Sequence, residues 1–463
     1  MFLKYLAPCA ATAVACLSLT FPSTPPPETA DATFKKLCSS CHGDVQAFVD
    51  RKWKHGTTKA ELIASISKGY SDFGMPAWEA TLKPAQIEGI ADLILSSIEK
   101  GSRYSFNNKP KSNLFKTEAY TVRLDTVASG LSSPWGMAFL PGGDLLATDR
   151  TGKIYRIGAN GQKSEVSGGP QVLAEGQGGL LDVVLHPKFD TNHWVYFSYS
   201  AVKDSPEGKV GTTAILRAKL DGTQLTDQQV IFEAQPWSKT RHHYGSRLAF
   251  DKAGYLFVTV GERGSEYTNP QNLESDLGKV HRLNDDGTPA AGNPFKDKGR
   301  ATIWSWGHRN PQGLYIDQAT GTIWETEHGP RGGDELNIIR KGANYGWPVI
   351  SYGIGYDGKA FTSLKAKEGM EQAQHYWVPS IAPSGLALVE GTRYPAWKGN
   401  FLVGSLRFKY LNRCVIKNNK VVKEEILFPN IGRVRNVKIA PDGYAYVAVE
   451  DPGVILKVVT TGK

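Results

Sequence analysis

The sequence is short of several features that would place a protein in a particular class. Cysteine is scarce, with five residues in 463, so a disulfide framework does not hold the fold together. Apart from the N-terminus, no apolar run reaches the roughly 18 residues of a membrane-spanning helix, and we expect a soluble body. No dense run of lysine and arginine and no aromatic RNA-binding motif occurs, which argues against nucleic-acid binding despite the net charge of +9. The excess charge lies outside residues 31–100 and favours an anionic ligand or an acidic redox partner.

The N-terminus has the features of a secretory signal peptide. A basic start precedes an apolar stretch at residues 6–19, and a proline-rich spacer follows at residues 22–27. We therefore predict that residues 1–30 are a signal peptide with its spacer and that the protein is periplasmic or secreted. The alternative to simple cleavage is a lipid anchor at Cys16, because residues 13–16 loosely fit a lipoprotein cleavage box. Only such a lipid would attach the protein to a membrane.

The character of the remaining chain changes twice. Residues 31–100 contain helix signals, among them the capping box Thr58-Lys59-Ala60-Glu61 and, from Pro84 to Ile98, apolar residues spaced as on one face of a helix. Residues 101–119 are rich in Lys, Asn, Ser and Gly and are predicted to be a linker. Residues 120–463 alternate between short apolar strands and turns.

One pattern recurs six times in residues 120–463: an apolar strand, a turn containing Asp, Pro, Gly or Asn, and a second apolar strand. Irregular repeats of this kind, each long enough for one small sheet, are typical of β-propeller blades. We therefore predict a mainly β fold, a six-bladed β-propeller preceded by a small all-α domain. A pair of β-sandwiches is the alternative that the pattern leaves open. The six instances begin at Trp135, Leu181, Ser246, Gln312, Ser384 and Val437.

Cys38-Ser39-Ser40-Cys41-His42 has the spacing of a c-type haem attachment site. Two thiols one helical turn apart can form thioethers with the haem vinyl groups, and the adjacent histidine can bind the iron. Met75, in a Gly-Met-Pro loop, is the predicted sixth ligand, with His55 as the alternative. Residues 31–100 resemble a class I cytochrome c, which also supports Met75. Such a domain carries electrons one at a time and does not select a substrate.

Three clusters in the predicted propeller combine polar residues with Gly and Pro, a composition that functional sites share with ordinary inter-blade loops. The clusters are Gln177–Asp182 with His242–Leu248, Gly307–Gly313, and Glu327–Glu335 with Asn344–Pro348. Together these motifs resemble the family of soluble sugar dehydrogenases of the aldose, glucose and sorbosone type, which depend on pyrroloquinoline quinone (PQQ) and are built on a six-bladed propeller. The resemblance runs over about residues 120–460.

The resemblance implies catalytic roles for His243 and Arg309. His243 would accept the proton of the sugar C1 hydroxyl, a task that suits an imidazole, while a hydride passes from C1 to the quinone. Arg309 and Asn310 would reach the quinone oxygens. The cofactor carries three carboxylates, which planar, permanently charged guanidinium groups suit. The other positions that the resemblance assigns to the cofactor are Gln177, His328, Arg407, Arg433 and Arg435, of which Arg407 stands where the best-known members carry Lys.

The resemblance also implies calcium at two places. One ion would bind the cofactor and the backbone carbonyls of Gly329 and Pro330, which are the hard oxygen ligands that calcium prefers, and would act as a Lewis acid. A second ion would use Glu335 and Tyr345, with Asp334 nearby. The acid expected shortly after this loop has no clear match before Asp357.

Departures from the family pattern surround the predicted substrate site. His242 replaces an acid beside His243, and Ser380 stands where Thr is expected. The aromatic residue expected near Tyr376 to cover the cofactor is displaced by one position. The preferred sugar therefore does not transfer from the family.

The sequence thus predicts an exported quinoprotein that oxidises an aldose or a related sugar, such as sorbosone, at its anomeric or aldehyde carbon. Electrons would pass to the fused haem c and then to a downstream periplasmic acceptor. Two other classes stay open: a non-catalytic propeller that binds a glycan or a protein, and a calcium-dependent lactonase-type hydrolase. Neither class has a use for the tethered haem. Cys414, in an apolar strand, is predicted to be a packed core residue.

Overall fold

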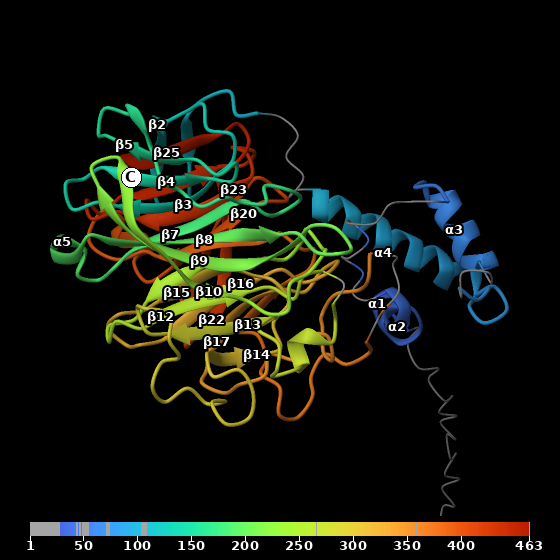
Figure 1. Cartoon of the computed structure of the whole chain (residues 1–463). Helices are drawn as coiled ribbons and strands as arrows, with labels where there is room; N and C mark the ends of the chain where they lie inside the picture. Colours follow the sequence, from blue (N-terminus) through green and yellow to red (C-terminus); the bar gives the residue numbers. More distant parts are fainter. Residues whose placement is uncertain are drawn as a thin grey trace, which may run out of the picture.

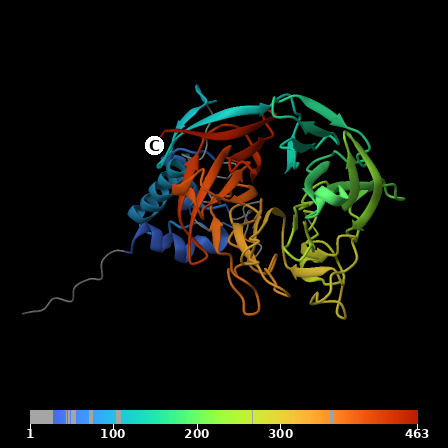
Figure 2. The same cartoon turned by 90° about the vertical axis from the view of Figure 1, so that its left-hand side faces the viewer.

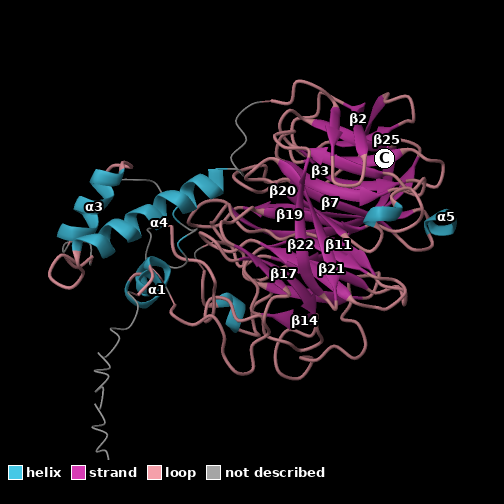
Figure 3. Ribbon diagram, turned by 180° about the vertical axis from the view of Figure 1, so that it is seen from behind, coloured by secondary structure: helices cyan, strands magenta, loops and turns pink. Residues whose placement is uncertain are grey.

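The computed structural model describes residues 28–42, 45, 48, 55–70, 75–102, 109–264, 266–356, 360 and 362–462. The predicted signal sequence and the lipoprotein box at residues 13–16 lie outside these residues. In the described part of the chain the helices α1–α4 are grouped apart from a body of strands (Figures 1 and 3). No helix of this described part is long and apolar enough to cross a membrane.

The N-terminal part is helical, as predicted. It contains α1 (Ala30–Leu37), α2 (Ser39–His42), α3 (Lys59–Lys68) and α4 (Pro84–Ser102). The predicted capping box at the start of α3 is confirmed: Thr58 Oγ1 accepts from Glu61 N at 3.3 Å, and Glu61 Oε2 accepts from Thr58 N at 2.9 Å. The apolar face predicted for α4 is confirmed as well, since it packs against α1 and α3. The buried residues of this core are Phe34, Phe48, Leu62, Ile66, Leu82, Ile87, Ile90, Ala91 and Ile94.

The body consists of six antiparallel sheets arranged as the blades of a propeller. Figure 2 shows the sheets following one another around a ring in the order of the sequence. Each of the six predicted strand–turn–strand units forms the first two strands of one blade. The six-bladed propeller is therefore confirmed, and the pair of β-sandwiches is wrong.

In five of the six blades the strands run outward from the centre in chain order. The first three blades are β3 (Pro134–Phe139), β4 (Leu145–Asp149), β5 (Ile154–Ile157) and β6 (Lys163–Val166); β7 (Leu180–Leu185), β8 (Trp194–Lys203), β9 (Val210–Asp221) and β10 (Gln224–Glu233); and β11 (Leu248–Phe250), β12 (Leu256–Val260), β13 (Lys279–Leu283) and β14 (Ile303–Trp306). The next two are β15 (Pro311–Ile316), β16 (Ile323–Glu327), β17 (Asp334–Ile339) and β18 (His375–Trp377); and β19 (Pro383–Leu388), β20 (Phe401–Ser405), β21 (Tyr410–Lys417) and β22 (Lys420–Leu427). Three short helical turns, α5 (Phe189–Asn192), η3 (Asn269–Gln271) and η4 (Pro395–Trp397), lie in the connections.

The sixth blade joins the two ends of the propeller and so closes the ring. It combines β23 (Val434–Ile439), β24 (Ala445–Val449) and β25 (Val454–Gly462) with β1 (Leu114–Lys116) and β2 (Thr121–Ala128). β2 pairs with β25 in the register Val122↔Thr460 and Leu124↔Val458. β1 lies within the segment whose composition predicts a linker.

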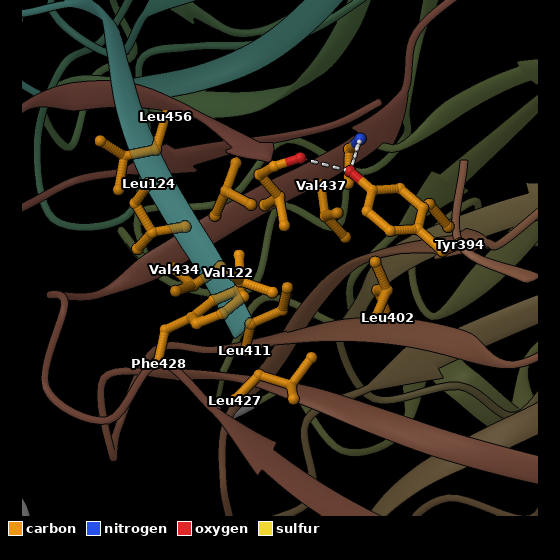
Figure 4. Packing of buried hydrophobic residues seen from close by; sticks show 14 of the residues in the cluster. Val122, Leu124, Tyr394, Leu402, Leu411, Leu427, Phe428, Val434, Val437 and Leu456 are labelled. Atoms are coloured by element: carbon orange, nitrogen blue, oxygen red, sulfur yellow. Dashed lines mark hydrogen bonds between the residues drawn. The ribbon is translucent and has the colours of Figure 1, made fainter. Parts of the chain in front are cut away.

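A large apolar cluster holds the closing blade against the blade before it (Figure 4). Val122 and Leu124 of β2 meet Leu402 and Leu411 of the neighbouring sheet in this cluster. Tyr394 Oη donates to Val458 O at 2.5 Å and accepts from Ala445 N at 3.0 Å, so its buried hydroxyl is satisfied. Burying this apolar surface stabilises the closed ring.

Candidate active site

The residues predicted for catalysis lie at one end of the propeller. His243 and Asn310 come just before the innermost strands β11 and β15, whereas Glu262 and His328 come just after the second strands β12 and β16. The first two strands of a blade are antiparallel, so the start of one and the end of the other meet at the same edge of the sheet. Loops of different blades therefore gather around the central axis.

His243 is held from two sides. Its backbone N–H donates to Gln177 Oε1 at 2.9 Å, and its Nδ1 lies 2.9 Å from Glu262 Oε1. The backbone of His243 has a φ of +52°, and Gly261 lies against it: a Cβ on Gly261 would lie 2.2 Å from His243 O. A glycine is therefore required where strand β12 ends. These contacts fix the orientation of the His243 imidazole, and the residue is only 8% exposed.

The electrostatics of this pair favour a neutral imidazole. Burial, followed by the positive charge of Arg309, lowers the pKa of His243 well below its usual value. Burial raises the pKa of Glu262 to about 7. When Glu262 is ionised, it can accept a hydrogen bond from Nδ1–H of His243. The tautomer with the proton on Nδ1 leaves Nε2 free to accept a proton. The arrangement is that of a histidine base oriented by a carboxylate.

Arg309 and Asn310 are locked beside His328. Arg309 N donates to Glu327 Oε2 at 2.6 Å, and its Nη1 donates to His328 O at 3.0 Å. Asn310 Oδ1 accepts from Gly245 N at 3.1 Å, while its Nδ2 lies 3.3 Å from His328 Nδ1. These bonds bring Arg309, Asn310 and His328 to the same end of the propeller as His243.

Two buried polar atoms of this group have no hydrogen-bond partner among the described residues, Arg309 Nε and His328 Nε2. A buried polar atom left without a partner costs about 1–3 kcal/mol. A polar ligand that reached these atoms would satisfy them. The donor set therefore fits a flat ligand with carbonyl or ring-nitrogen atoms, as PQQ is.

The loop after β16 offers the backbone carbonyls predicted for calcium, and Asp334 anchors it. Asp334 accepts from Gly329 N at 2.8 Å, from Ser380 Oγ at 3.0 Å and from Ala382 N at 2.7 Å. The Gly329 carbonyl accepts from Arg309 Nη1 at 2.5 Å, and the Pro330 carbonyl accepts from Ser380 Oγ at 3.2 Å. A carbonyl oxygen has two lone pairs, so both can also serve a calcium ion.

Arg433 and Arg435 are paired through one buried carboxylate. Glu450 accepts from Arg433 Nε at 3.0 Å and from Arg435 Nε at 2.7 Å. Although burial alone would raise it, the charges of Arg435 and Arg433 lower the pKa of Glu450 to about 2. Arg435 Nη1 also donates to Gln312 Oε1 at 2.6 Å, and Gln312 Nε2 lies 3.4 Å from Asn310 Oδ1. A chain of hydrogen bonds thus links the arginine pair to the group around His328.

Arg407 stands at the edge of this set. Arg433 Nη1 donates to Leu406 O at 3.2 Å, which brings the chain next to Arg407 close to the arginine pair. The Arg407 side chain is exposed, and its guanidinium carbon lies 4.9 Å from the centre of the Phe408 ring.

The structure gives Glu335 and Tyr345 different surroundings. Glu335 Oε2 accepts from Asn337 Nδ2 at 3.2 Å, whereas the Tyr345 hydroxyl donates to Ile338 O at 2.5 Å and its ring stacks on His308. A calcium ion that uses both residues stays a prediction. Asp357 lies outside the described residues.

In the helical domain, Cys38 and Met75 pack against the same apolar core. The His42 ring lies 5.4 Å from the Phe48 ring. The side chain of Cys41 and the residue Gly74 lie outside what the structure describes. The two candidates for the sixth iron ligand both adjoin Tyr70: Met75 N donates to Tyr70 O at 3.1 Å, and the His55 ring stacks on the Tyr70 ring at 3.8 Å. The choice of Met75 therefore stays a prediction.

Sequence reasoning missed Glu262 and Glu450 and assigned no role to Gln312, although each of the three contacts a predicted site residue. Two of them share a signal with Glu327, because an acid occurs where the second strand of a blade ends: Glu262 after β12, Glu327 in β16 and Glu450 after β24. An acid repeated at the same position of several blades predicts carboxylates at one end of the propeller. Gln312 lies in the cluster Gly307–Gly313 that the sequence singles out, but nothing in the sequence indicates its bond with Arg435.

Comparisons with known proteins place the two parts of the chain. A family model described as glucose/sorbosone dehydrogenase matches residues 131–457, and one described as cytochrome c oxidase, cbb3-type, subunit III matches residues 25–94. The aldose sugar dehydrogenase YliI of Escherichia coli is 41% identical over 347 residues, which cover 73% of this chain and 93% of that protein.

Two solved structures are similar to the propeller. One is the soluble aldose sugar dehydrogenase of Escherichia coli in its apo form, 38% identical with a TM-score of 0.70, covering 73% of this chain and 100% of the other. The other is the PQQ-bound aldose sugar dehydrogenase of Streptomyces coelicolor, 32% identical with a TM-score of 0.61, covering 74% and 99% of the two chains.

Proposed function

The chain belongs to the glucose/sorbosone dehydrogenase family and is a PQQ-dependent sugar dehydrogenase with a cytochrome c domain, and on this basis we propose that it oxidises an aldose or a related sugar at its anomeric or aldehyde carbon. The observation that carries this proposal is the buried His243–Glu262 pair beside Arg309, Asn310 and His328. A sugar-binding module would need no oriented base of this kind.

His243 is the proposed base. Its Nε2 accepts the proton of the sugar hydroxyl. Glu262 accepts a hydrogen bond from Nδ1–H, which keeps the ring in the tautomer that this step requires. Burial of the pair keeps competing water from this nitrogen. The Gln177 side chain fixes the backbone of His243 and thereby the position of the ring.

The residues proposed to hold PQQ surround this base. Arg433 and Arg435 would offer guanidinium groups to its carboxylates, and Arg309 and Asn310 would bind its quinone oxygens. Arg407 adds positive charge at the edge, and His328 offers a ring nitrogen. When bound, PQQ supplies a carbonyl that accepts two electrons, and calcium on the carbonyl oxygens of Gly329 and Pro330 polarises it.

We predict that the rate of sugar oxidation rises with pH through about 7. The pKa of Glu262 is raised to about 7, and its ionised form is the stronger acceptor for the hydrogen bond from His243 Nδ1–H. The pKa of His243 lies well below its usual value, so protonation of the ring adds nothing in this range. Glu262→Gln removes the charge. We expect this variant to lose the rise in rate near pH 7 and to have a kcat/KM lower by roughly tenfold or more. The measurement is kcat/KM from pH 5.5 to 9. The exposed Glu165→Gln is the control, and a limb near pH 7 that survives in Glu262→Gln would contradict the assignment.

We predict that Arg435→Leu weakens PQQ binding. Loss of a charge-assisted hydrogen bond costs about 1.5–3 kcal/mol, or about 10- to 150-fold in Kd, and Glu450 would then face the cofactor carboxylates with one counter-charge fewer. The measurement is a calorimetric titration of the apoprotein with PQQ. Arg413→Leu is the matched control, because Arg413 is equally buried and paired with Glu425 at 2.6 Å in another part of the propeller. Equal Kd values for Arg435→Leu and the wild type would contradict the role of Arg435 in binding PQQ.

Export and the fate of the electrons complete the proposal. The N-terminal sequence predicts a periplasmic or secreted protein, and a haem attached in that compartment accepts electrons one at a time from a reduced quinone. A covalently tethered haem has a high local concentration. A downstream periplasmic acceptor then reoxidises it.

The proposal is tested by reconstituting the purified apoprotein with PQQ and calcium and supplying a panel of aldoses with an electron-accepting dye. Dye reduction that needs both PQQ and a sugar, with the lactone or acid as product, is the expected result. Lactone hydrolysis without PQQ would favour the hydrolase, and sugar binding without dye reduction would favour the non-catalytic propeller.

A further inference from the structure

A second cluster of buried polar residues lies behind the proposed PQQ site. Strands β16 and β17 place Glu325 opposite Asn337 and Glu327 opposite Glu335, and His308 approaches from the loop before β15. Glu325, Asn337 and His308 are fully buried, and Glu327 is 4% exposed. The proposed reaction uses none of these side chains as base or as ligand of PQQ.

The cluster has more carboxyl groups than cationic partners. Neither Glu325 nor Glu335 has an ion-pair partner among the described residues, and the partner of Glu327 is His308, at 3.3 Å. Carboxylates without a counter-charge are costly in a buried place.

Hydrogen bonds within the protein do not satisfy the cluster. Asn337 Nδ2 lies 3.2 Å from one oxygen of each of the three glutamates, Glu325, Glu327 and Glu335. An amide nitrogen has only two hydrogens, so three acceptors share two donors. In addition, Glu325 Oε1 and Asn337 Oδ1 are buried without a partner among the described residues. The set therefore has more acceptors than the protein has donors for it.

We propose that His308, Glu325 and Glu327 bind a divalent metal ion, with Asn337 as a further oxygen ligand. One ligand atom of each of the first three residues lies within 4.8 Å of the others, a spacing that one ion about 2.0–2.4 Å from each atom can bridge. Rotation of the Asn337 amide would put Oδ1 where Nδ2 now faces the carboxylates, since the two atoms are nearly the same size.

The ligand types indicate which ions fit. His308 Nε2 lies 2.9 Å from Ser305 Oγ, and this bond orients the ring with Nδ1 towards the carboxylates, as is usual for metal-binding histidines. One imidazole nitrogen combined with carboxylates suits Mn²⁺ or Zn²⁺, whereas calcium prefers a shell of oxygens alone. The site thus differs in ligands and in metal from the calcium predicted at Glu335 and Tyr345.

An ion at this site would also affect the neighbouring residues of the proposed PQQ site. Glu327 also accepts from the backbone N–H of Arg309 at 2.6 Å and directly precedes His328. An ion held by Glu327 would therefore fix the ends of β16 and of the loop before β15, from which Arg309 and His328 reach the proposed PQQ site.

The first test is the metal content of the full-length holoprotein after exhaustive dialysis against chelator-free buffer to which no metal salt is added. We expect about one equivalent of manganese or zinc per chain in addition to haem iron, and a loss of at least tenfold in Glu325→Gln. Glu424→Gln is the matched control, because Glu424 contacts His375 and Asn412 outside the cluster, and it should keep the metal. The proposal is overturned if the wild type holds neither metal even after incubation with MnCl₂ or ZnCl₂, or if Glu325→Gln holds as much.

The second test is thermal unfolding, which keeps the proposal open to disproof if the variant folds poorly. Wild-type protein stripped with a strong chelator should gain about 5 °C in Tm with one of the two ions in large excess over its Kd. Glu325→Gln should show no such gain while its haem spectrum stays that of the wild type. If neither protein responds and Glu325→Gln is as stable as the wild type, the glutamates are neutral acids that need no ion. Both tests use metal content and stability, so their outcome is independent of sugar oxidation.

Discussion

His243→Ala is expected to lower kcat for sugar oxidation by about 10² to 10⁴-fold while PQQ binds as in the wild type. The imidazole is the proposed proton acceptor, and it is buried and oriented by Glu262 at 2.9 Å. Removing it leaves no other side chain with the same hydrogen bonds at this position. The measurement is dye-linked sugar oxidation by protein reconstituted with PQQ and calcium, combined with a PQQ titration.

His242→Ala is the matched control for this variant. The ring of His242 lies 6.4 Å from that of His243, so both variants remove an imidazole from the same loop. We expect His242→Ala to keep activity within tenfold of the wild type. If His243→Ala also stays within tenfold at saturating PQQ, His243 is not the base.

A double variant, Cys38→Ser with Cys41→Ser, is expected to separate sugar oxidation from haem reduction. Without the two thiols no thioether forms, so the protein should lose its covalently bound haem and all internal electron transfer. Dye-linked sugar oxidation should persist, because the proposed base and PQQ ligands all lie in the propeller. The measurement is the visible spectrum of the denatured protein beside the dye assay.

Cys414→Ser is the control for the double variant. Cys414 is fully buried in the propeller core, as predicted, and its replacement should leave the haem content unchanged. Covalent haem that persists in the double variant would refute the attachment site. Loss of dye-linked oxidation would show instead that the haem takes part in the sugar reaction itself.

The blades could be predicted from the sequence because their signal is local. Each of the six apolar strand–turn–strand units, such as the one that begins at Trp135, forms the first two strands of a blade. The closure of the ring carries no such signal. β2 and β25 are adjacent in the sheet but lie at opposite ends of the propeller sequence. No residue of either strand indicates which strand it pairs with.

The candidate site likewise contains some residues that the sequence indicates and others that it does not. Motif residues such as Arg309 and Asn310 could be proposed because they lie together in one loop whose motif resembles that of the sugar dehydrogenase family. Glu262 and Glu450 were missed because each follows an ordinary apolar strand and acts on a residue from another segment, His243 and the Arg433–Arg435 pair. Only the assembled propeller shows that an acid at this blade position faces the axis.

The most direct measurement is the visible spectrum of the oxidised full-length protein, taken with PQQ and calcium before and after addition of an aldose. We expect the haem to become reduced only when PQQ, calcium and the sugar are all present, because the quinone must first take electrons from the sugar. Haem reduction by the sugar without PQQ would contradict the proposed path, as would a haem that dithionite reduces but no aldose reduces in the reconstituted protein.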